Sequence, residues 1–157
     1  MWDASPAFEN IHGCPDGDMD MLPKPAGGKL LLITGASQEA PDWIARHGAG
    51  WINYPRPASV QAKIVADWRA RARVEAVGGA AKPAMQSLSV DLTDDPDMPP
   101  QPIHLGFRAG VLHLRAYLKE LGSIGVNHVV LNLRFNHADI ETTIHRLAAE
   151  VLPDFSV

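Results

Sequence analysis

The chain has one cysteine, no long apolar run and no cluster of positive charge, and each shortage excludes a class of protein. Cys14 has no partner for an internal disulfide, and no zinc-ligand spacing surrounds it. No apolar run approaches the ~20 residues of a membrane helix. Met1 is not followed by the apolar core of a signal peptide. We therefore expect a cytoplasmic protein without a membrane segment.

The sequence also shows no cluster of basic residues and no motif for metal binding or nucleophilic catalysis. The chain has 14 Lys and Arg against 18 Asp and Glu, a formal net charge of −4. The basic residues form no stripe, and those at 69, 71 and 73 fall at the end of a predicted helix, where they complement the helix dipole. We expect no nucleic-acid partner. No His and carboxylate pair has metal-ligand spacing and no nucleophile has a base beside it, so we assign neither a metal nor a catalytic residue.

Residues 1–28 differ in composition from the rest of the chain. They are rich in Pro, Gly, Asp and Met and show no usable periodicity. Asp16-Gly17 is a candidate hairpin turn between arms at 8–12 and 19–22, and a poorly ordered leader is the alternative. We therefore divide the chain into an irregular leader or hairpin insertion at 1–28 and one domain at 29–157.

The domain at 29–157 alternates predicted strands with predicted helices. The apolar run at 30–34 predicts a buried strand, and further strands are expected at 50–54, 83–92 and 126–133. Helices are expected at 38–47, 58–75, 109–121 and 138–151. The Pro- and Asp-rich stretch 94–102 is expected to be irregular. In the last helix the residues expected on the buried face are Ile140, Ile144, Leu147, Ala148 and Val151.

Four consecutive βα units predict an α/β fold with a parallel sheet and right-handed crossovers. Two architectures satisfy this order. An open doubly wound sheet has helices on both faces, whereas half of an eight-stranded βα barrel keeps every helix on the outer face of its strands. In both architectures the ligand lies beyond the carboxyl ends of the strands.

The turn after the first strand is a candidate anion site. Gly35-Ala36-Ser37 connects that strand to the helix expected from Gln38. The first N–H groups of a helix have no partner within the helix, and the helix dipole is positive there. A phosphate group on a ligand suits such a position.

A family resemblance extends from about residue 18 to residue 155. The chain is similar there to the carboxyl-terminal half of the bacterial luciferase-like flavin monooxygenases, in the luciferase-type oxidoreductase branch. The matching segments follow one another with family-like spacing. They are Leu-Pro-Lys-Pro at 22–25, Ile-Thr-Gly-Ala-Ser-Gln at 33–38, 42–51, Tyr-Pro-Arg-Pro at 54–57, 103–108 and 125–136.

The resemblance implies a (βα)8 barrel of roughly twice this length, to which this chain contributes strands five to eight. It also implies a flavin-dependent oxidoreductase or monooxygenase that uses reduced FMN, or the deazaflavin F420, to oxidise a small organic substrate. In the family the turn after strand five holds the flavin phosphate through backbone N–H groups and a serine hydroxyl. That turn corresponds to Gly35, Ala36, Ser37 and Gln38. One departure is Ala49, where the family often has an acidic residue.

Other polar residues at the predicted strand ends complete the candidate cofactor site. Thr34 and Tyr54 border the two first loops, and Arg56 between two prolines is a candidate second phosphate ligand, with a salt bridge at the rim as its alternative. Arg108 is either a ligand for phosphate or substrate or the partner of an aspartate at 91–97. His128 and Asn132 alternate on one strand and are expected to face a barrel interior.

Three interpretations remain open at this stage. The chain is either an active flavin enzyme or an incomplete, inactive half-barrel that acts as a flavin-binding or self-associating module. A half-barrel has exposed strand edges, so we expect a homo-oligomer or pairing with a missing amino-terminal half. The third interpretation is a flavodoxin-like open sheet that binds an unrelated phosphorylated ligand.

Overall fold

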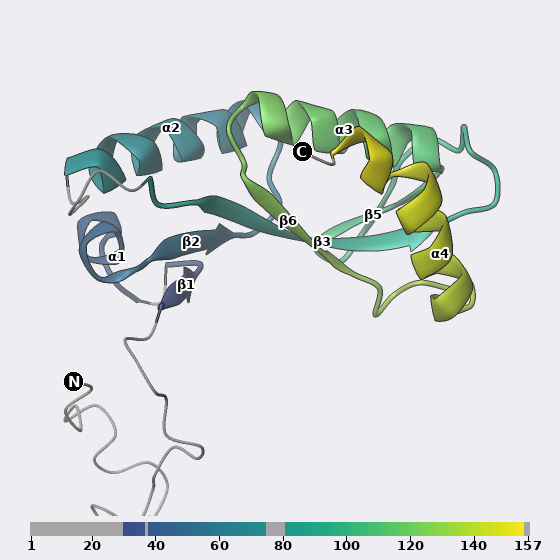
Figure 1. Ribbon diagram of the computed structural model, residues 1–157, viewed down its shortest axis with the longest axis horizontal. Coiled ribbons are helices and arrows are strands. Elements are labelled where there is room, and N and C mark those ends of the chain that lie inside the picture. Colours follow the sequence, from purple (N-terminus) through teal and green to yellow (C-terminus); the bar gives the residue numbers. More distant parts are fainter. Residues whose placement is uncertain (1–29, 37, 75–80, 156–157) are drawn as a thin grey trace, which may run out of the picture. The chain divides into compact units, whose positions relative to one another are not determined.

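The computed structural model of the chain describes residues 30–36, 38–74 and 81–155 (Figure 1). The strands are β1 (Leu32–Thr34), β2 (Gly50–Asn53), β3 (Ala84–Leu92), β4 (Gln101–Ile103), β5 (Gly106–Ala109) and β6 (His128–Asn132). The helices are α1 (Pro41–His47), α2 (Ala58–Val74), α3 (Val111–Ser123) and α4 (Ile140–Glu150), followed by a 3-10 turn at Leu152–Asp154. All of these elements belong to one compact unit, Leu31–Val157. The hairpin predicted at Asp16-Gly17 and the predicted boundary after residue 28 lie outside the described residues.

The sheet is mostly parallel, which confirms the predicted α/β class. Strands β1, β2, β3 and β6 lie side by side in chain order and all pair parallel. The hairpin of β4 and β5 adds to the far end of β3, where β5 pairs parallel with β3 and β4 pairs antiparallel with β5. Each of the four parallel strands is followed by a helix, α3 after the intervening hairpin, as the four predicted βα units require.

The strand register divides the side chains of the sheet between its two faces. Directly paired residues of parallel strands point to the same side, and successive residues alternate. One row runs from Ile33 through Trp51 to Ala84, and a second includes Leu88 and Leu131. These residues belong to the two hydrophobic clusters of the core, so we call this the covered face.

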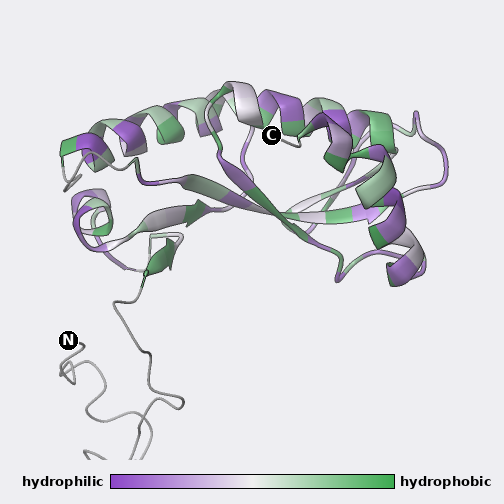
Figure 2. Cartoon of the chain, viewed as in Figure 1, coloured by the Kyte–Doolittle hydropathy of each residue, from purple (hydrophilic) through white to green (hydrophobic). Residues whose placement is uncertain are grey.

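The four described helices all pack against the covered face. Ile44 of α1 and Trp68 of α2 share one cluster with Ile33 and Ala84. Leu114 of α3 and Leu147 of α4 share the other with Leu88, Val90 and Leu92. Figure 1 shows α2 and α3 on the same side of the sheet, and Figure 2 shows hydrophobic and hydrophilic bands alternating along the helices. A doubly wound sheet needs helices on both faces, so that alternative does not fit the described elements.

The opposite face of the sheet, which we call the open face, has no helix among the described residues. Its side chains combine apolar and polar groups. They are Leu32, Thr34, Ile52, Met85, Ser87, Ser89, Asp91, Arg108, His128, Val130 and Asn132. Leu32 is 44 % exposed and Val130 is 50 % exposed. Apolar side chains at this exposure leave part of the open face available for another molecule to cover.

The first strand was predicted to be buried, and this is wrong. Of its apolar run only Ile33, at 6 % exposure, is buried, whereas Leu30 is 86 % exposed and Leu31 43 %. The reason is position, because β1 is an edge strand that pairs only with β2 among the described strands. Ile33 is the residue of this run that joins the core cluster with Ile44 of α1.

Three further predictions about elements need correction. Helix α1 begins at Pro41 and not at residue 38. Gln101–Ile103, expected to be irregular, is strand β4. Arg108, expected to lead into the following helix, lies in β5, and α3 starts only at Val111 after Gly110. Gly106 allows β5 to lie directly against β3, because a Cβ atom there would be 1.8 Å from the Ser89 carbonyl oxygen.

The buried face of α4 also differs from the prediction. Ile140 and Ile144 are 55 % and 52 % exposed, whereas Thr143, Leu147 and Val151 are buried. The Thr143 hydroxyl donates to the Asp139 carbonyl oxygen at 2.8 Å and accepts from Nδ2 of Asn136 at 2.9 Å. Both bonds satisfy the Thr143 hydroxyl, so this polar side chain can be buried on the inner side of α4, where the sequence predicted Ile140 and Ile144.

The described helices also bear on the expected absence of a membrane segment. Across residues 30–36, 38–74 and 81–155, no helix combines the length and the apolar character that crossing a bilayer requires.

Candidate functional site

The turn after β1 has an unusual backbone. Gly35 and Gln38 both have φ near +60°, in the left-handed region that glycine adopts most readily. The N–H of Gly35 donates to the Ile52 carbonyl at 2.8 Å, and its carbonyl oxygen accepts from Nε1 of Trp51 at 2.6 Å. A Cβ atom on Gly35 would lie 3.0 Å from the Tyr54 ring. The turn is therefore tied to β2 and leaves little room at Gly35.

These bonds change how the turn could hold an anion. The Gly35 N–H is used within the protein, and α1 starts three residues later than expected, at a proline without an N–H. A helix N-terminus directly behind the turn, which the sequence predicted, is therefore wrong. The N–H groups of Ala36 and Gln38 have no partner among the described residues. Ser37 lies outside those residues, so its predicted role stays a prediction.

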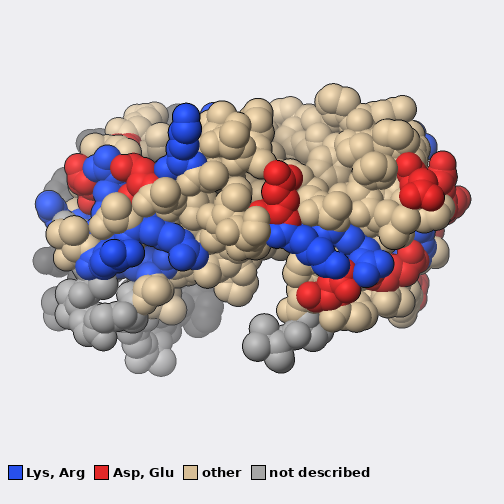
Figure 3. All heavy atoms as spheres, turned by 90° about the horizontal axis from the view of Figure 1, so that it is seen from above, with Lys and Arg blue, Asp and Glu red and all other residues tan. Residues whose placement is uncertain are grey.

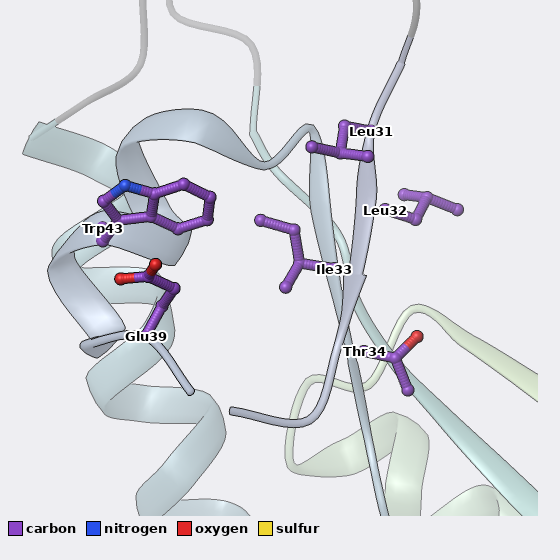
Figure 4. A pocket seen from close by; sticks show the side chains of 6 residues that line it. All are labelled: Leu31, Leu32, Ile33, Thr34, Glu39 and Trp43. Carbon is purple, nitrogen blue, oxygen red and sulfur yellow. The ribbon is translucent and has the colours of Figure 1, made fainter. Parts of the chain in front are cut away.

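A hollow of about 420 Å³ lies between β1 and α1 (Figure 4). In this view Ile33 points to Trp43, while Leu32 and Thr34 point to the other side of β1. Because the hollow wraps around the free edge of β1, we interpret it as the open border of the sheet and not as an enclosed ligand site.

Arg56 lines a different hollow from Thr34. This hollow has a volume of about 590 Å³ and lies between the loop after β2 and the β4–β5 hairpin. Its walls are largely apolar, with Leu88, Phe107 and four prolines, and the Tyr117 ring completes them. The Tyr117 hydroxyl accepts from Nε2 of Gln86 at 3.0 Å, and burial raises its pKa. The structure therefore does not place Arg56 in the same hollow as the turn.

Arg108 lies on the open face beside a buried carboxylate. Its Nε is 3.6 Å from Oδ2 of Asp91, whose side chain is only 2 % exposed. The two residues are direct register partners on β5 and β3. The expected alternative of an ion pair with one of the aspartates at 91–97 is thus confirmed, and a role of Arg108 in cofactor binding stays a prediction.

The same carboxylate holds a residue that the sequence analysis missed. Oδ2 of Asp91 is 2.6 Å from Nδ1 of His137, and Oδ1 accepts the main-chain N–H of His137 at 3.0 Å. Asn136 also ties the loop after β6 to β3, through its Oδ1 and the N–H of Leu92 at 3.0 Å. The available signal was Asp91 itself, the charged residue between the apolar Val90 and Leu92 of β3.

The remaining candidates lie on or near the open face. His128 and Asn132 share the open side of β6 with Val130, so their common face is confirmed, whereas a barrel interior on that side stays a prediction. Oδ1 of Asn132 accepts the N–H of Arg134 at 3.0 Å, which shapes the loop after β6. His104 lies in the β4–β5 turn, with its ring 6.0 Å from that of Phe135. In the part of the chain that the structure describes, no group of three or more His, Cys, Asp or Glu could hold a metal ion.

Charged side chains on the helical side form separate ion-pair groups. Arg71 contacts Asp42 and Asp67, Asp154 lies between Arg115 and Lys119, and Arg146 contacts Asp94 and Glu150. In the view of Figure 3, several clusters of basic side chains adjoin acidic ones. Such paired charges favour a solvated surface over a polyanion-binding one.

Comparisons with known proteins leave the family open. No protein-family model matches the chain, and no curated protein matches it at a significant level. The resemblance to luciferase-like flavin monooxygenases therefore rests on the matching sequence segments alone.

Proposed function

We propose that this chain is the carboxyl-terminal half of a (βα)8 barrel and binds a phosphorylated flavin at the carboxyl ends of its parallel strands, as part of a luciferase-like, flavin-dependent oxidoreductase. FMN is the proposed cofactor and the deazaflavin F420 its alternative. The substrate is a small organic molecule that lies with the flavin over the open face.

One observation carries this proposal more than any other. Strands β1, β2, β3 and β6 follow one another in chain order, and every described helix packs on one face of the sheet. Right-handed crossovers that always add the next strand on the same side produce this arrangement, and it is the arrangement of a βα barrel. The other face then becomes the barrel interior, with polar groups at its carboxyl end.

The residues of the turn after β1 fit a phosphate in part. Ala36 and Gln38 offer N–H groups without a partner among the described residues, and backbone N–H groups are suitable donors to a phosphate. Tyr54 packs against Gly35 and limits the space beside the turn. We assign the phosphate to the turn residues Ala36, Ser37 and Gln38. Thr34 and Tyr54 flank this site, and Gly35 provides the left-handed backbone at the start of the turn.

The roles of the cofactor and of the protein follow from the general chemistry of flavin proteins. A bound flavin supplies the electron-transfer chemistry, and the protein binds, orients and shields it. The covered face excludes water from one side of the sheet through its two hydrophobic clusters. Arg56 and Arg108, exposed on separate loops and strands, offer positive charge to anionic parts of the cofactor or substrate.

A titration with two flavins tests this function. FMN and riboflavin differ only in the phosphate, so a chain with the proposed site binds FMN and quenches its fluorescence, and binds riboflavin more weakly by about tenfold or more. Ser37→Glu places a negative charge in the turn and is expected to abolish the preference for FMN. Asp42→Glu, in α1, is the matched control and should retain it. Equal affinities for both flavins in the unaltered chain contradict the phosphate assignment.

The exposed apolar groups of the open face favour a second candidate function. Leu32, Val130 and the partly exposed Ile52 and Met85 line a surface bounded by the free edges of β1 and β6. In this alternative the chain is an inactive half-barrel that self-associates or pairs with an amino-terminal half. The flavin titration distinguishes a purely structural module, which binds neither flavin, and size-exclusion chromatography with light scattering then measures its self-association.

A further inference from the structure

A buried carboxylate fixes one imidazole at the carboxyl end of β3, apart from the turn to which we assign the phosphate. Asp91 is 2 % exposed, and both of its oxygens contact His137. Oδ2 lies 2.6 Å from Nδ1 of the ring and Oδ1 accepts the main-chain N–H. The His137 side chain is 75 % exposed. One carboxylate therefore fixes both the backbone and the ring of a histidine whose other nitrogen is accessible.

This contact determines where the imidazole carries its proton. An ionised carboxylate can only accept hydrogen bonds, so the neutral ring must carry its hydrogen on Nδ1. Its Nε2 is then an acceptor that lies across the ring from Asp91. The same logic operates where an aspartate orients the histidine of a hydrolase triad.

A permanent positive charge lies beside this pair. Nε of Arg108 is 3.6 Å from the same Oδ2 that contacts His137, and the Arg108 side chain is 41 % exposed. Arg108 therefore lies beside the carboxylate that holds the ring, and the three side chains form one Arg108–Asp91–His137 group. An imidazole held at one nitrogen by a carboxylate suits proton transfer from a hydroxyl group at its other nitrogen.

We propose that His137 is a general base that accepts the proton of a weakly acidic hydroxyl group on a ligand bound over the open face. In this step the O–H bond of the ligand breaks, a bond forms between the proton and Nε2, and the ligand oxygen keeps the electron pair. Asp91 is a positioning residue. The inference rests on the proposed function for the place of the ligand, because a substrate of the flavin would lie over the same strand ends.

Asp91→Asn separates an orienting role from a merely structural one. In this variant the amide oxygen at position 91 can still accept the main-chain N–H of His137. The amide nitrogen then donates to Nδ1 of the His137 ring. The hydrogen of the ring must move to Nε2, which can no longer accept a proton. We expect ¹⁵N NMR to find the Nδ1–H form of His137 in the unaltered chain and the Nε2–H form in Asp91→Asn. An Nε2–H form in the unaltered chain overturns the proposal even if the variant fails to fold.

p-Nitrophenol is a suitable probe ligand, because its anion absorbs at a longer wavelength than the neutral form. In a neutral buffer the unaltered chain, at a concentration above that of the probe, should raise the anion fraction of added p-nitrophenol above its value in buffer alone, and His137→Gln and Asp91→Asn should lose at least about 90 % of that increase. His145→Gln should keep it, since His145 is similarly exposed but its nearest carboxylate, on Glu141, is 4.0 Å away and itself exposed.

The outcomes distinguish this inference from the proposed function. No increase in the anion fraction with the unaltered chain, or an equal increase with His137→Gln, overturns the role of His137. FMN binding is measured on the same samples, and we expect His137→Gln to bind FMN as the unaltered chain does. Loss of FMN binding by every sample, with the proton transfer intact, would contradict the flavin and leave the base in place.

Discussion

At the scale of single residues, a few side chains determine how the loops at the strand ends are held. Asp91 ties the loop after β6 to β3, and Asp139 caps α4, which follows that loop. Oδ2 of Asp139 accepts the N–H of Thr142 at 2.8 Å. That bond is the main reason why the pKa of Asp139 is lowered from its ordinary value of 3.8.

The cap predicts a dependence of stability on pH. Because the pKa of Asp139 is lower in the folded chain than in the unfolded chain, the contribution of Asp139 is complete above pH 3.8 and is lost as the pH falls through the lowered value. Asp139→Ala should lower the melting temperature at neutral pH by a few degrees, and the difference from the unaltered chain should shrink in acid. In Asp139→Asn the cap is neutral but still effective, so the stabilisation from the cap should change little with pH. Circular dichroism melts at several pH values check this, and a constant difference for Asp139→Ala contradicts it.

The residue scale also sets a limit on what the sequence could predict. The strand-end position of Thr34, Gly35 and Tyr54 follows from the apolar run that precedes each loop. The contact between Asp91 and His137 joins residues 46 positions apart, and no local pattern encodes such a pairing. A charged residue between two apolar residues of a strand indicates that it has a partner, but does not identify that partner.

At the scale of elements, periodicity predicted the parallel strands and helices but not the hairpin between β3 and α3. The prolines at 99, 100 and 102 favour irregular structure, yet Pro102 occupies β4 opposite Phe107. Proline is tolerated there because β4 is an edge strand. The predicted buried face of α4 was correct at Leu147 and Val151 but wrong at Ile140 and Ile144, because Thr143 occupies the inner side with its own hydrogen-bond partners.

Two glycines test how tightly the hairpin and α3 are packed. A Cβ atom on Gly106 would meet the Ser89 carbonyl oxygen at 1.8 Å, so Gly106→Ala should separate β5 from β3 and destabilise the chain by at least about 2 kcal/mol.

Gly122 lies in α3 with nothing within 4 Å of its added Cβ atom, so Gly122→Ala should stabilise the chain by about 0.5–1 kcal/mol. Urea denaturation measures both, and a neutral Gly106→Ala would contradict the register of β5.

At the scale of the whole molecule, the account depends on the difference between the covered and open faces of one sheet. The covered face holds all the described helices, and the open face carries exposed Leu32 and Val130 beside polar strand ends. The sequence predicted the α/β class through the order of its elements. It could not predict that β1 is an exposed edge, because an apolar strand has the same composition whether or not a neighbouring strand covers it.

The open face predicts self-association of the isolated chain. Its apolar side chains and the free edges of β1 and β6 are expected to be covered by a second copy when no other partner is present. Val130→Lys adds a charge to this face and should shift the chain toward the monomer. Leu112→Lys changes a similarly exposed apolar residue on α3 and should not. Sedimentation velocity measures the two variants, and equal dissociation by both would exclude the open face as the interface.

The central claim is that a phosphorylated flavin binds over the open face at the carboxyl ends of β1, β2, β3 and β6. The most direct measurement is a titration of the ¹⁵N-labelled chain with FMN, followed by amide shifts and compared with riboflavin. The account predicts FMN-dependent shifts at Ala36, Gln38 and Tyr54, smaller ones for riboflavin, and none on the outward side of α2. Shifts confined to the helices, or no shift with either flavin, would contradict it.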